Sequence, residues 1–312
     1  MRLFGKAEKK NGWLAIGLTA DGVQAAAIER RTGGLPKVLL AASYPGKADE
    51  AGATLARLGK DLHPNRYECT TLLGAGGYQL LMVEAPNVPE AEMKTALGWR
   101  VKDMIDFPLE QATIDMALLP AANGSSQARQ AFAVAARNSV LMPHQQLFAD
   151  SKIALTAIDI GEMAQRNISA LLEPEGRGLA LLAFDADGGL LTVSYQSELY
   201  LARRIDITLN QLLDPDPDRL HQLYDRITLE LQRSLDHFER QFSFVTVAKL
   251  VLSPVGDGDL YTYLTSNLYL PVEQLDLTKV LDLSAAPELQ EPAQQAGFLR
   301  TLGAALRERA SA

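Results

Sequence analysis

Two acidic turns of the same type stand near the starts of the two halves of this chain. Ala-Asp-Gly occurs at residues 20–22 and again at residues 186–188, each time between two β-prone apolar runs. Asp-Gly between such runs is typical of a tight hairpin, because glycine adopts a positive φ without strain. Asp185 and Asp187 are two residues apart, so on an extended chain their carboxylates share a face and have the chemistry to bind a cation. A turn is the favoured explanation, because Asp stabilises turns through its own backbone hydrogen bonds.

Other residues that carry chemistry lack the spacing of a known site. The glycine cluster at residues 74–77 is without the Lys-Ser/Thr pair of a phosphate-binding P-loop, so a turn between strands is favoured. The four histidines, which have neither ligand-like spacing nor cysteine support, are His63, His144, His221 and His237. No Gly-x-Ser-x-Gly string marks a hydrolase nucleophile. The sequence therefore predicts no catalytic set and no metal site.

Length, charge and cysteine content narrow the class of protein. With 312 residues the chain is long enough for two domains, each with its own core. A formal net charge of −8 has the wrong sign for a sequence-independent nucleic-acid binder, which needs a basic face. Cys69 is the single cysteine, so no intrachain disulfide forms and a reducing, cytoplasmic location fits. No apolar run approaches the roughly 20 residues of a membrane span.

Strand and helix patterns occur in two similar series. The first series is predicted to contain a three-stranded meander at 13–44, a helix at 49–62 and a strand at 68–73. The second is predicted to open with the hairpin at 179–207 and to continue with a long amphipathic helix at 218–242. Repetition of the hairpin indicates a duplicated α/β fold with mixed sheets and a cleft between the halves.

Five short strings, in this order along the chain, resemble those of the PilM-type branch of the actin-like ATPase family. They are Phe4-Gly-Lys6, the segment 96–110 that ends in Phe-Pro-Leu-Glu, Ala133-Val-Ala-Ala-Arg137, Glu230-Leu-Gln-Arg-Ser-Leu235 and Gly303-Ala-Ala-Leu-Arg307. The resemblance covers nearly the whole chain and is greatest for the members that serve MSHA-type pili. It implies an actin-like, ribonuclease H-like duplicated fold, with two domains around a central cleft and a PilM/FtsA-type inserted subdomain.

The resemblance also implies where the domains begin and end. The first actin-like subdomain is expected to comprise residues 1–78, 155–175 and the C-terminal helix 297–312. The inserted subdomain is expected to cover residues 79–154. The residues themselves predict a turn at 123–126 within it. The second actin-like domain is expected to cover residues 176–296, including a helical part around 208–243.

A nucleotide site between the two hairpins and a later glycine-rich turn is a further implication of the resemblance. Family members that bind ATP have an Asp near the metal, a Gly beside the phosphates and often a Lys in the first hairpin. An ungapped comparison places Gly17 at the Asp, Thr19 at the Gly and Gln24 at the Lys. A shift of one or two residues in this comparison would bring Asp21 into play, but Asp-Gly fits the turn itself better.

The later loops depart from the family pattern as well. In the second hairpin, Ala183 stands at the Asp and Asp185 at the Gly, where a carboxylate repels phosphate oxygens unless a cation intervenes. Thr208-Leu209 replaces the paired glycines that follow, and its side chains fill space that a nucleotide needs. Ser253-Pro-Val-Gly256 replaces the adenosine-side glycine-rich turn, and its proline removes an N–H donor.

We therefore expect a degenerate nucleotide site that does not hydrolyse ATP and holds no cofactor. The residues of this degenerate site are predicted to be Gly17, Thr19, Asp21, Asp185, Asp187, Gly188, Ser253 and Gly256. The alternative is a functional Mg-ATP-binding ATPase of a type IV pilus or type II secretion system, with loops displaced from the ungapped comparison. A filament-forming cytoskeletal protein is a third hypothesis.

Trp99, Arg100, Phe107 and Pro108 are the predicted partner-binding residues. The resemblance implies docking near them of the N-terminal cytoplasmic tail of a PilN-like, single-span inner-membrane protein. An aromatic side chain beside Arg is typical of peptide interfaces, although burial of Trp99 and Phe107 in a core explains them equally well. The resemblance therefore implies a cytoplasmic protein that is held at the inner face of the bacterial inner membrane by its partner. Whether the protein forms a homodimer is left open. The apolar face of the last helix suits a membrane surface, but burial is favoured because the matching family helix is internal.

Overall fold

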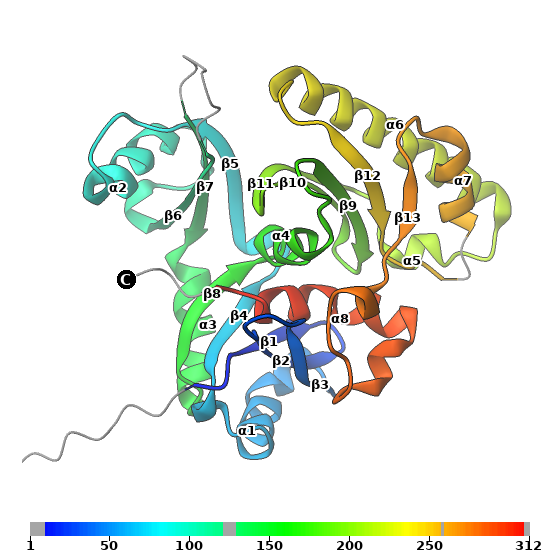
Figure 1. Cartoon of the computed structure of the whole chain (residues 1–312). Helices are drawn as coiled ribbons and strands as arrows, with labels where there is room; N and C mark the ends of the chain where they lie inside the picture. The colour runs from blue at the N-terminus through cyan, green and yellow to red at the C-terminus, as the bar shows by residue number, and fades with distance from the viewer. Residues whose placement is uncertain (1–9, 121–128, 257–258, 309–312) are drawn as a thin grey trace, which may run out of the picture.

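The computed structural model describes residues 10–120, 129–256 and 259–308. Two five-stranded sheets face each other across two helices, and a smaller third sheet stands at one side (Figure 1). The string Phe4-Gly-Lys6 and the turn predicted at residues 123–126 lie outside the described ranges. Within those ranges no helix combines the length and apolar character that crossing a membrane requires.

The two large sheets repeat one topology. In the first sheet the strands are β1 (Trp13–Thr19), β2 (Gly22–Glu29), β3 (Lys37–Pro45), β4 (Glu68–Leu73) and β8 (Leu155–Ile160), in the order β3-β2-β1-β4-β8. In the second they are β9 (Gly178–Asp185), β10 (Gly188–Tyr195), β11 (Glu198–Ile205), β12 (Val247–Leu252) and β13 (Val272–Gln274), in the order β11-β10-β9-β12-β13. Each is an antiparallel meander followed by two parallel strands. The predicted duplication is confirmed.

Both faces of the first sheet are covered, so its central strands are apolar almost throughout. Leu14 and Ile16 of β1 pack with α1 (Ala51–Asp61) on one face, and Ala15 between them packs with α8 (Pro292–Ala305) on the other. Successive residues of a strand point to opposite faces, which explains why the large and small side chains alternate. The small alanine lets α8 lie close to the sheet.

Helices α4 (Gly161–Leu172) and α8 fill the space between the two sheets (Figure 1). They touch closely at Gly303, where a Cβ atom would lie 2.1 Å from the carbonyl oxygen of Ala164. The Asn167 side chain of α4 donates a hydrogen bond of 2.8 Å to the Gly303 carbonyl oxygen. The apolar face of α8 and its C-cap, formed by Phe298, Leu299, Leu302 and Leu306, is buried. The favoured prediction for this helix, burial, is confirmed.

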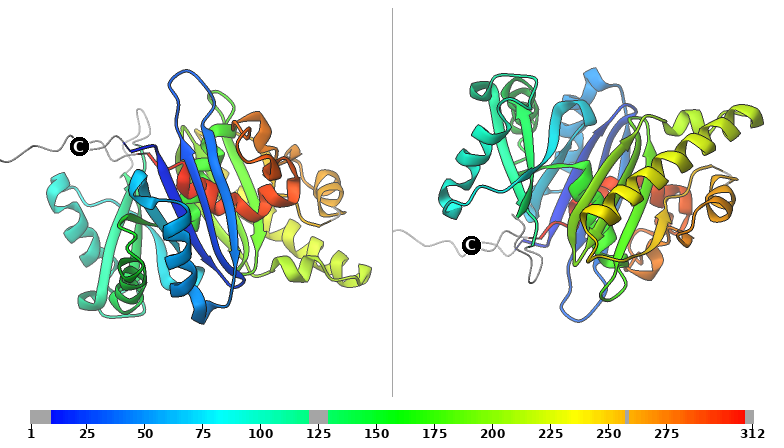
Figure 2. Two further views of the ribbon diagram at one scale, coloured as in Figure 1. Left: turned by 90° about the horizontal axis from the view of Figure 1, so that it is seen from below. Right: turned by 90° about the horizontal axis from the view of Figure 1, so that it is seen from above.

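The third sheet comprises β5 (Tyr78–Glu84), β6 (Ala112–Leu118) and β7 (Gln130–Arg137), in the order β5-β7-β6. Its strands stand beside the larger sheets in both views of Figure 2, and α2 (Glu90–Val101) packs on one face of it. Leu119 and Phe132 join the core of the second half. Helix α3 (Asn138–Asp150) follows β7, and its Phe148 lies in the core of the first half. The inserted subdomain, with α3, is therefore held by both halves.

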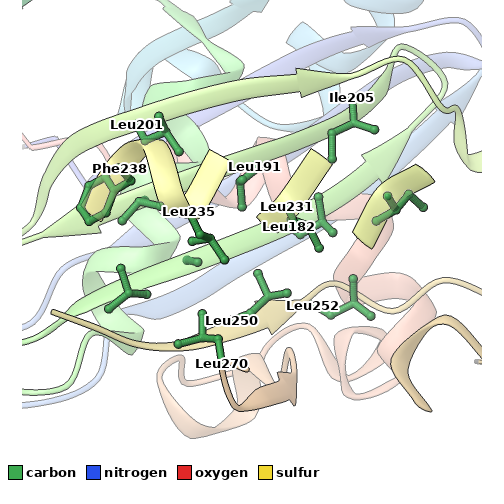
Figure 3. Close-up of a cluster of buried hydrophobic side chains, with 14 of the residues drawn as sticks. Leu182, Leu191, Leu201, Ile205, Leu231, Leu235, Phe238, Leu250, Leu252 and Leu270 are labelled. Atoms are coloured by element: carbon green, nitrogen blue, oxygen red, sulfur yellow. The ribbon is translucent and has the colours of Figure 1, made fainter. Parts of the chain in front are cut away.

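The core of the second half lies between its sheet and α6 (Pro217–Gln241), as Figure 3 shows. The predicted stripe of α6 supplies four fully buried side chains, Ile227, Leu231, Leu235 and Phe238. Asp216 begins the helix by accepting hydrogen bonds from the backbone N–H groups of Asp218 and Arg219. The short helices α5 (Leu209–Leu212) and α7 (Asp259–Asn267) complete this half.

Candidate functional site

Both Ala-Asp-Gly turns form tight connections between strands. Gly22 and Gly188 adopt positive φ angles of 135° and 121°. A Cβ atom at either glycine would lie within 3 Å of a backbone oxygen of a neighbouring segment, 2.2 Å from Tyr44 and 2.8 Å from Ile205. The Asp185 carboxylate accepts a 2.9 Å hydrogen bond from the backbone N–H of Asp187, as turn-forming acids do. Glycine is therefore required at these positions both by the backbone of the turn and by the neighbouring strand.

An arginine from α8 occupies the position beside the second turn. The Arg300 guanidinium forms an ion pair with Asp185 and lies 3.6 Å from the Asp187 carboxylate. Burial raises the pKa of Asp185, and the positive charge of Arg300 opposes that rise. The two acids that have the spacing for a cation thus face a cation supplied by the chain.

Thr301, the residue after Arg300 in α8, contacts the first hairpin. Gly17 of β1 is buried opposite Gln24, and a Cβ atom on it would lie 3.3 Å from the Thr301 hydroxyl. That hydroxyl donates a 3.3 Å hydrogen bond to the Gln24 side chain. Thr19 and Asp21 lie exposed at the turn. Consecutive residues of α8 therefore contact both hairpins.

The later loop positions carry structural roles. Thr208 begins α5 with a capping box, in which its side chain and that of Gln211 bond each other's backbone N–H groups. Ser253 is buried, and its N–H donates a 2.8 Å hydrogen bond to the Leu182 carbonyl oxygen. A Cβ atom on Gly256 would lie 2.8 Å from a methyl group of Leu213. Ser253 and Gly256 thus belong to a packed turn in the second half, at the end of β12.

A buried acid joins three parts of the fold near Arg300. Glu162, in the first turn of α4, is 2% exposed and accepts a 2.8 Å hydrogen bond from Arg204 of β11. The Tyr78 hydroxyl, at the start of β5, donates a 2.5 Å hydrogen bond to the other carboxylate oxygen. Arg204 also donates to that hydroxyl at 2.7 Å. Burial, together with the negative charge of Glu162, raises the pKa of Tyr78, so the phenol stays protonated.

This arrangement is suited to holding the chain together and poorly suited to holding a Mg-nucleotide. A phosphate beside the second hairpin would meet the Asp185 and Asp187 carboxylates, where phosphate sites use backbone N–H groups or cationic side chains. Across the described residues, no three His, Cys, Asp or Glu side chains are grouped so as to hold a metal ion. The acids of the second hairpin are instead paired with Arg300 of the same chain.

The predicted partner residues divide into an exposed set and a buried one. Trp99 of α2 is 62% exposed, with the Lys102 ammonium 5.7 Å from the ring centroid. Arg100 is exposed and pairs with Glu84 at 3.3 Å. Phe107 is buried beneath the Arg137 guanidinium, which lies 4.3 Å from its ring centroid.

Pro108 is exposed, but it follows that buried ring. Met104 was not among the predicted partner residues; it follows α2, the helix that holds Trp99, and is 50% exposed. The two large apolar side chains give the inserted subdomain an exposed apolar surface. Phe107 instead serves the core of that subdomain.

A surface pocket of about 460 Å³ lies elsewhere, against α3 and the edge strand β8. It is lined by Gln145, Ala149, Lys152, Ile153, Ala154 and Leu155. The sequence assigned no role to these residues, because they carry no recognisable motif.

Comparison with known proteins decides the fold. No protein-family model and no curated protein matches this sequence. Among solved structures, the chain is similar to the PilM–PilN type IV pilus biogenesis complex, with a TM-score of 0.72 and 21% identity over 95% of this chain and 98% of that chain. It is also similar to a protein of Bacteroides thetaiotaomicron with an actin-like ATPase fold and unknown function, with a TM-score of 0.50 and 12% identity over 91% and 97%. The chain has an actin-like ATPase fold.

Within this actin-like fold, the sequence missed the residues that meet at the centre. Arg300, Arg204, Glu162 and Tyr78 come from four elements that are distant in sequence. No local spacing connects them, since α8 and α4 reach the second sheet only in the folded protein. The hairpin acids were found because their signal is local.

Proposed function

We propose that this protein is a scaffold of a type IV pilus assembly platform and that it does not hydrolyse ATP. It binds the N-terminal cytoplasmic tail of a PilN-like inner-membrane protein. The observation that carries the proposal is the similarity to PilM, in a complex with PilN, over 95% of the chain. On this proposal the protein lies in the cytoplasm at the inner face of the inner membrane and is held there by its partner.

Within that class we place the protein with MshI, the PilM-like protein of the MSHA-type pilus system. The five strings in family order, together with the altered nucleotide loops, support this assignment. The genes beside this one provide the test: MSHA pilus genes are expected there. A type II secretion cluster would overturn the assignment.

The absence of hydrolysis is supported by what surrounds the two hairpins. Arg300 pairs with the acids of the second, and Thr301 stands against Gly17 in the first. A thermal-shift titration with Mg-ATP is expected to leave the melting temperature unchanged. A ligand at 100 times its Kd would add about 2.7 kcal/mol of stability, so a clear upward shift would instead support a working ATPase.

The partner's tail is proposed to dock on the exposed face of the inserted subdomain, around Trp99 and Met104. Large side chains that are free in the monomer and lie near an arginine are typical anchors of peptide interfaces. The test measures the affinity of a synthetic peptide with the sequence of the tail, taken from the PilN-like protein whose gene lies beside this one. Trp99→Ala is expected to weaken binding by about 2 kcal/mol, roughly 30-fold.

Leu35→Ala is the matched control, because Leu35 is 47% exposed but lies between β2 and β3. It is expected to leave the peptide affinity unchanged. Equal affinity of the Trp99→Ala variant and the native protein would place the tail on another surface.

Sedimentation of the pure protein would show whether it dimerises, and long filaments would contradict the scaffold proposal.

A further inference from the structure

Alternating charges run from α8 to the inserted sheet. They belong to Arg300 of α8, Asp185 and Asp187 of the second hairpin, Arg204 of β11 and Glu162 of α4, and they end at the Tyr78 hydroxyl of β5. We call these six side chains the clasp. Its members come from α4 and α8, from the second sheet and from the inserted sheet.

At its first end, the clasp ties α8 to the second hairpin. Arg300 is 25% exposed and also lies against the start of α4, where a Cβ atom on Gly161 would sit 3.6 Å from its Nε atom. A guanidinium is planar and always charged, so it suits two carboxylates at a partly buried position. The neighbouring Thr301 fixes the same turn of α8 to the first hairpin.

The middle of the clasp passes through Arg204. Its positive charge acts on Asp185, and the negative charge of Asp187 acts in turn on Arg204. The same guanidinium donates a hydrogen bond to Glu162, which is almost fully buried. Because an unpaired buried carboxylate is costly, the position of Arg204 is closely constrained.

At its other end the clasp reaches Tyr78, the first residue of β5. Tyr78 is 8% exposed, so its ring packs while its hydroxyl completes the polar contacts of Glu162. Hydrogen bonds to a buried carboxylate such as Glu162 reinforce one another, so the loss of one partner weakens the remaining bond. A substitution of Arg300 can therefore lower the local stability of β5 in the inserted sheet.

We propose that the clasp holds the two halves and the inserted subdomain in one arrangement without any bound ligand, and that loosening it at Arg300 also loosens the inserted sheet. The proposal does not depend on the pilus partner, since it concerns contacts within one chain. The two ends of the clasp adjoin at the start of α4, where Arg300 lies against Gly161 and the next residue, Glu162, accepts the hydrogen bonds of Arg204 and Tyr78.

Hydrogen exchange of the full-length protein tests the proposal. In Arg300→Gln, amide exchange is expected to become about tenfold faster or more both at the β9–β10 turn and in β5. Arg300→Lys, which keeps a positive charge, is expected to show a smaller change at the same two places. Faster exchange at the turn alone, or at neither place, would overturn the proposal.

Arg219→Gln provides the matched control. Arg219 also pairs with two carboxylates, Asp214 and Asp216, each at 3.3 Å, but all three lie in one loop and the start of α6. Its loss is expected to leave exchange in β5 unchanged. An effect of equal size in β5 would mean that exchange there reports general destabilisation, and it would also overturn the proposal.

Two more variants keep the test decisive if Arg300→Gln does not fold. Asp187→Asn removes the more exposed carboxylate and is expected to raise exchange at both places by a smaller factor. Tyr78→Phe removes only the last hydroxyl, and because coupling is reciprocal, it is expected to raise exchange at the β9–β10 turn. An unchanged turn in Tyr78→Phe would contradict the coupling.

Discussion

Glu162 shows how a single buried charge can fix several parts of a fold. Its carboxylate has two partners, Arg204 and Tyr78, and almost no contact with solvent. Removal of one partner of a buried pair is costly because the other is left without compensation. The Arg204 side chain is itself 38% exposed, so water can solvate its charge when Glu162 is removed, which reduces the loss of stability.

Glu162→Gln is therefore expected to lower the free energy of unfolding by about 1–3 kcal/mol, measured by urea denaturation. Glu308→Gln is the control, since the Arg30–Glu308 pair lies at the surface with Glu308 75% exposed. A surface pair contributes about 0–1 kcal/mol, so this variant is expected to unfold almost as the native protein does. Equal effects of the two variants would contradict the role assigned to Glu162.

His144 gives the protein a pH-dependent contribution to stability. Its Nε2 atom lies 3.1 Å from the Thr71 hydroxyl, its ring stacks near Phe148, and burial lowers its pKa. The folded protein favours the neutral ring, whereas the unfolded chain takes up a proton below about pH 6.5. The contribution is therefore fully present above that pH and is lost as the pH falls toward the lowered pKa.

Urea midpoints measured between pH 7.5 and pH 5 test this expectation, at pH values chosen to lie on both sides of about 6.5. His144→Gln is expected to flatten the decline at the acidic end. His237→Gln, at an exposed position of α6, is expected to leave the decline unchanged. The same slope in all three proteins would rule out His144 as its source.

At the scale of elements, the contact between α4 and α8 depends on the absence of one methyl group. A Cβ atom at Gly303 would clash with the Ala164 carbonyl oxygen at 2.1 Å, so the two helices would have to move apart. Gly303→Ala is expected to destabilise the protein by about 1–3 kcal/mol in thermal or urea unfolding.

Gly297 lies in the same helix, and a Cβ atom added to it would have no neighbouring atom within 4 Å. Gly297→Ala is expected to be neutral or to stabilise by up to about 1 kcal/mol, because alanine favours the helix. The same substitution, Gly→Ala, is thus expected to stabilise the protein at position 297, where helix propensity decides, and to destabilise it at position 303, where packing decides. Destabilisation by both substitutions would contradict the packing explanation.

At the scale of the whole molecule, the two halves share a core. One cluster of buried side chains joins Ala15 and Ile28 of the first sheet, Leu181 of the second, and Ile168 and Leu302 of the helices between them. Neither half can lose its structure without exposing apolar surface of the other, so we expect one cooperative unfolding transition. Calorimetry provides the measurement, and two separate transitions would contradict it.

The sequence by itself determined the parts of this protein that depend on local patterns. Turn glycines, alternating strands and the apolar stripe of α6 each act within a few residues, so the duplicated hairpins and the long helix could be predicted. The strings that resemble PilM pointed to the actin-like fold, which comparison of the structures then showed. Asp185 and Asp187 were found by the same local reasoning.

Only the tertiary structure decided what faces those acids and which aromatic side chains are free. Arg300 reaches Asp185 because α8 is laid between two sheets whose strands come from opposite halves of the chain. Trp99 is exposed while Phe107 is buried, although both lie in one short segment. Burial and ion pairing at these positions depend on which surfaces meet in the folded protein, and residue spacing along the chain does not carry that information.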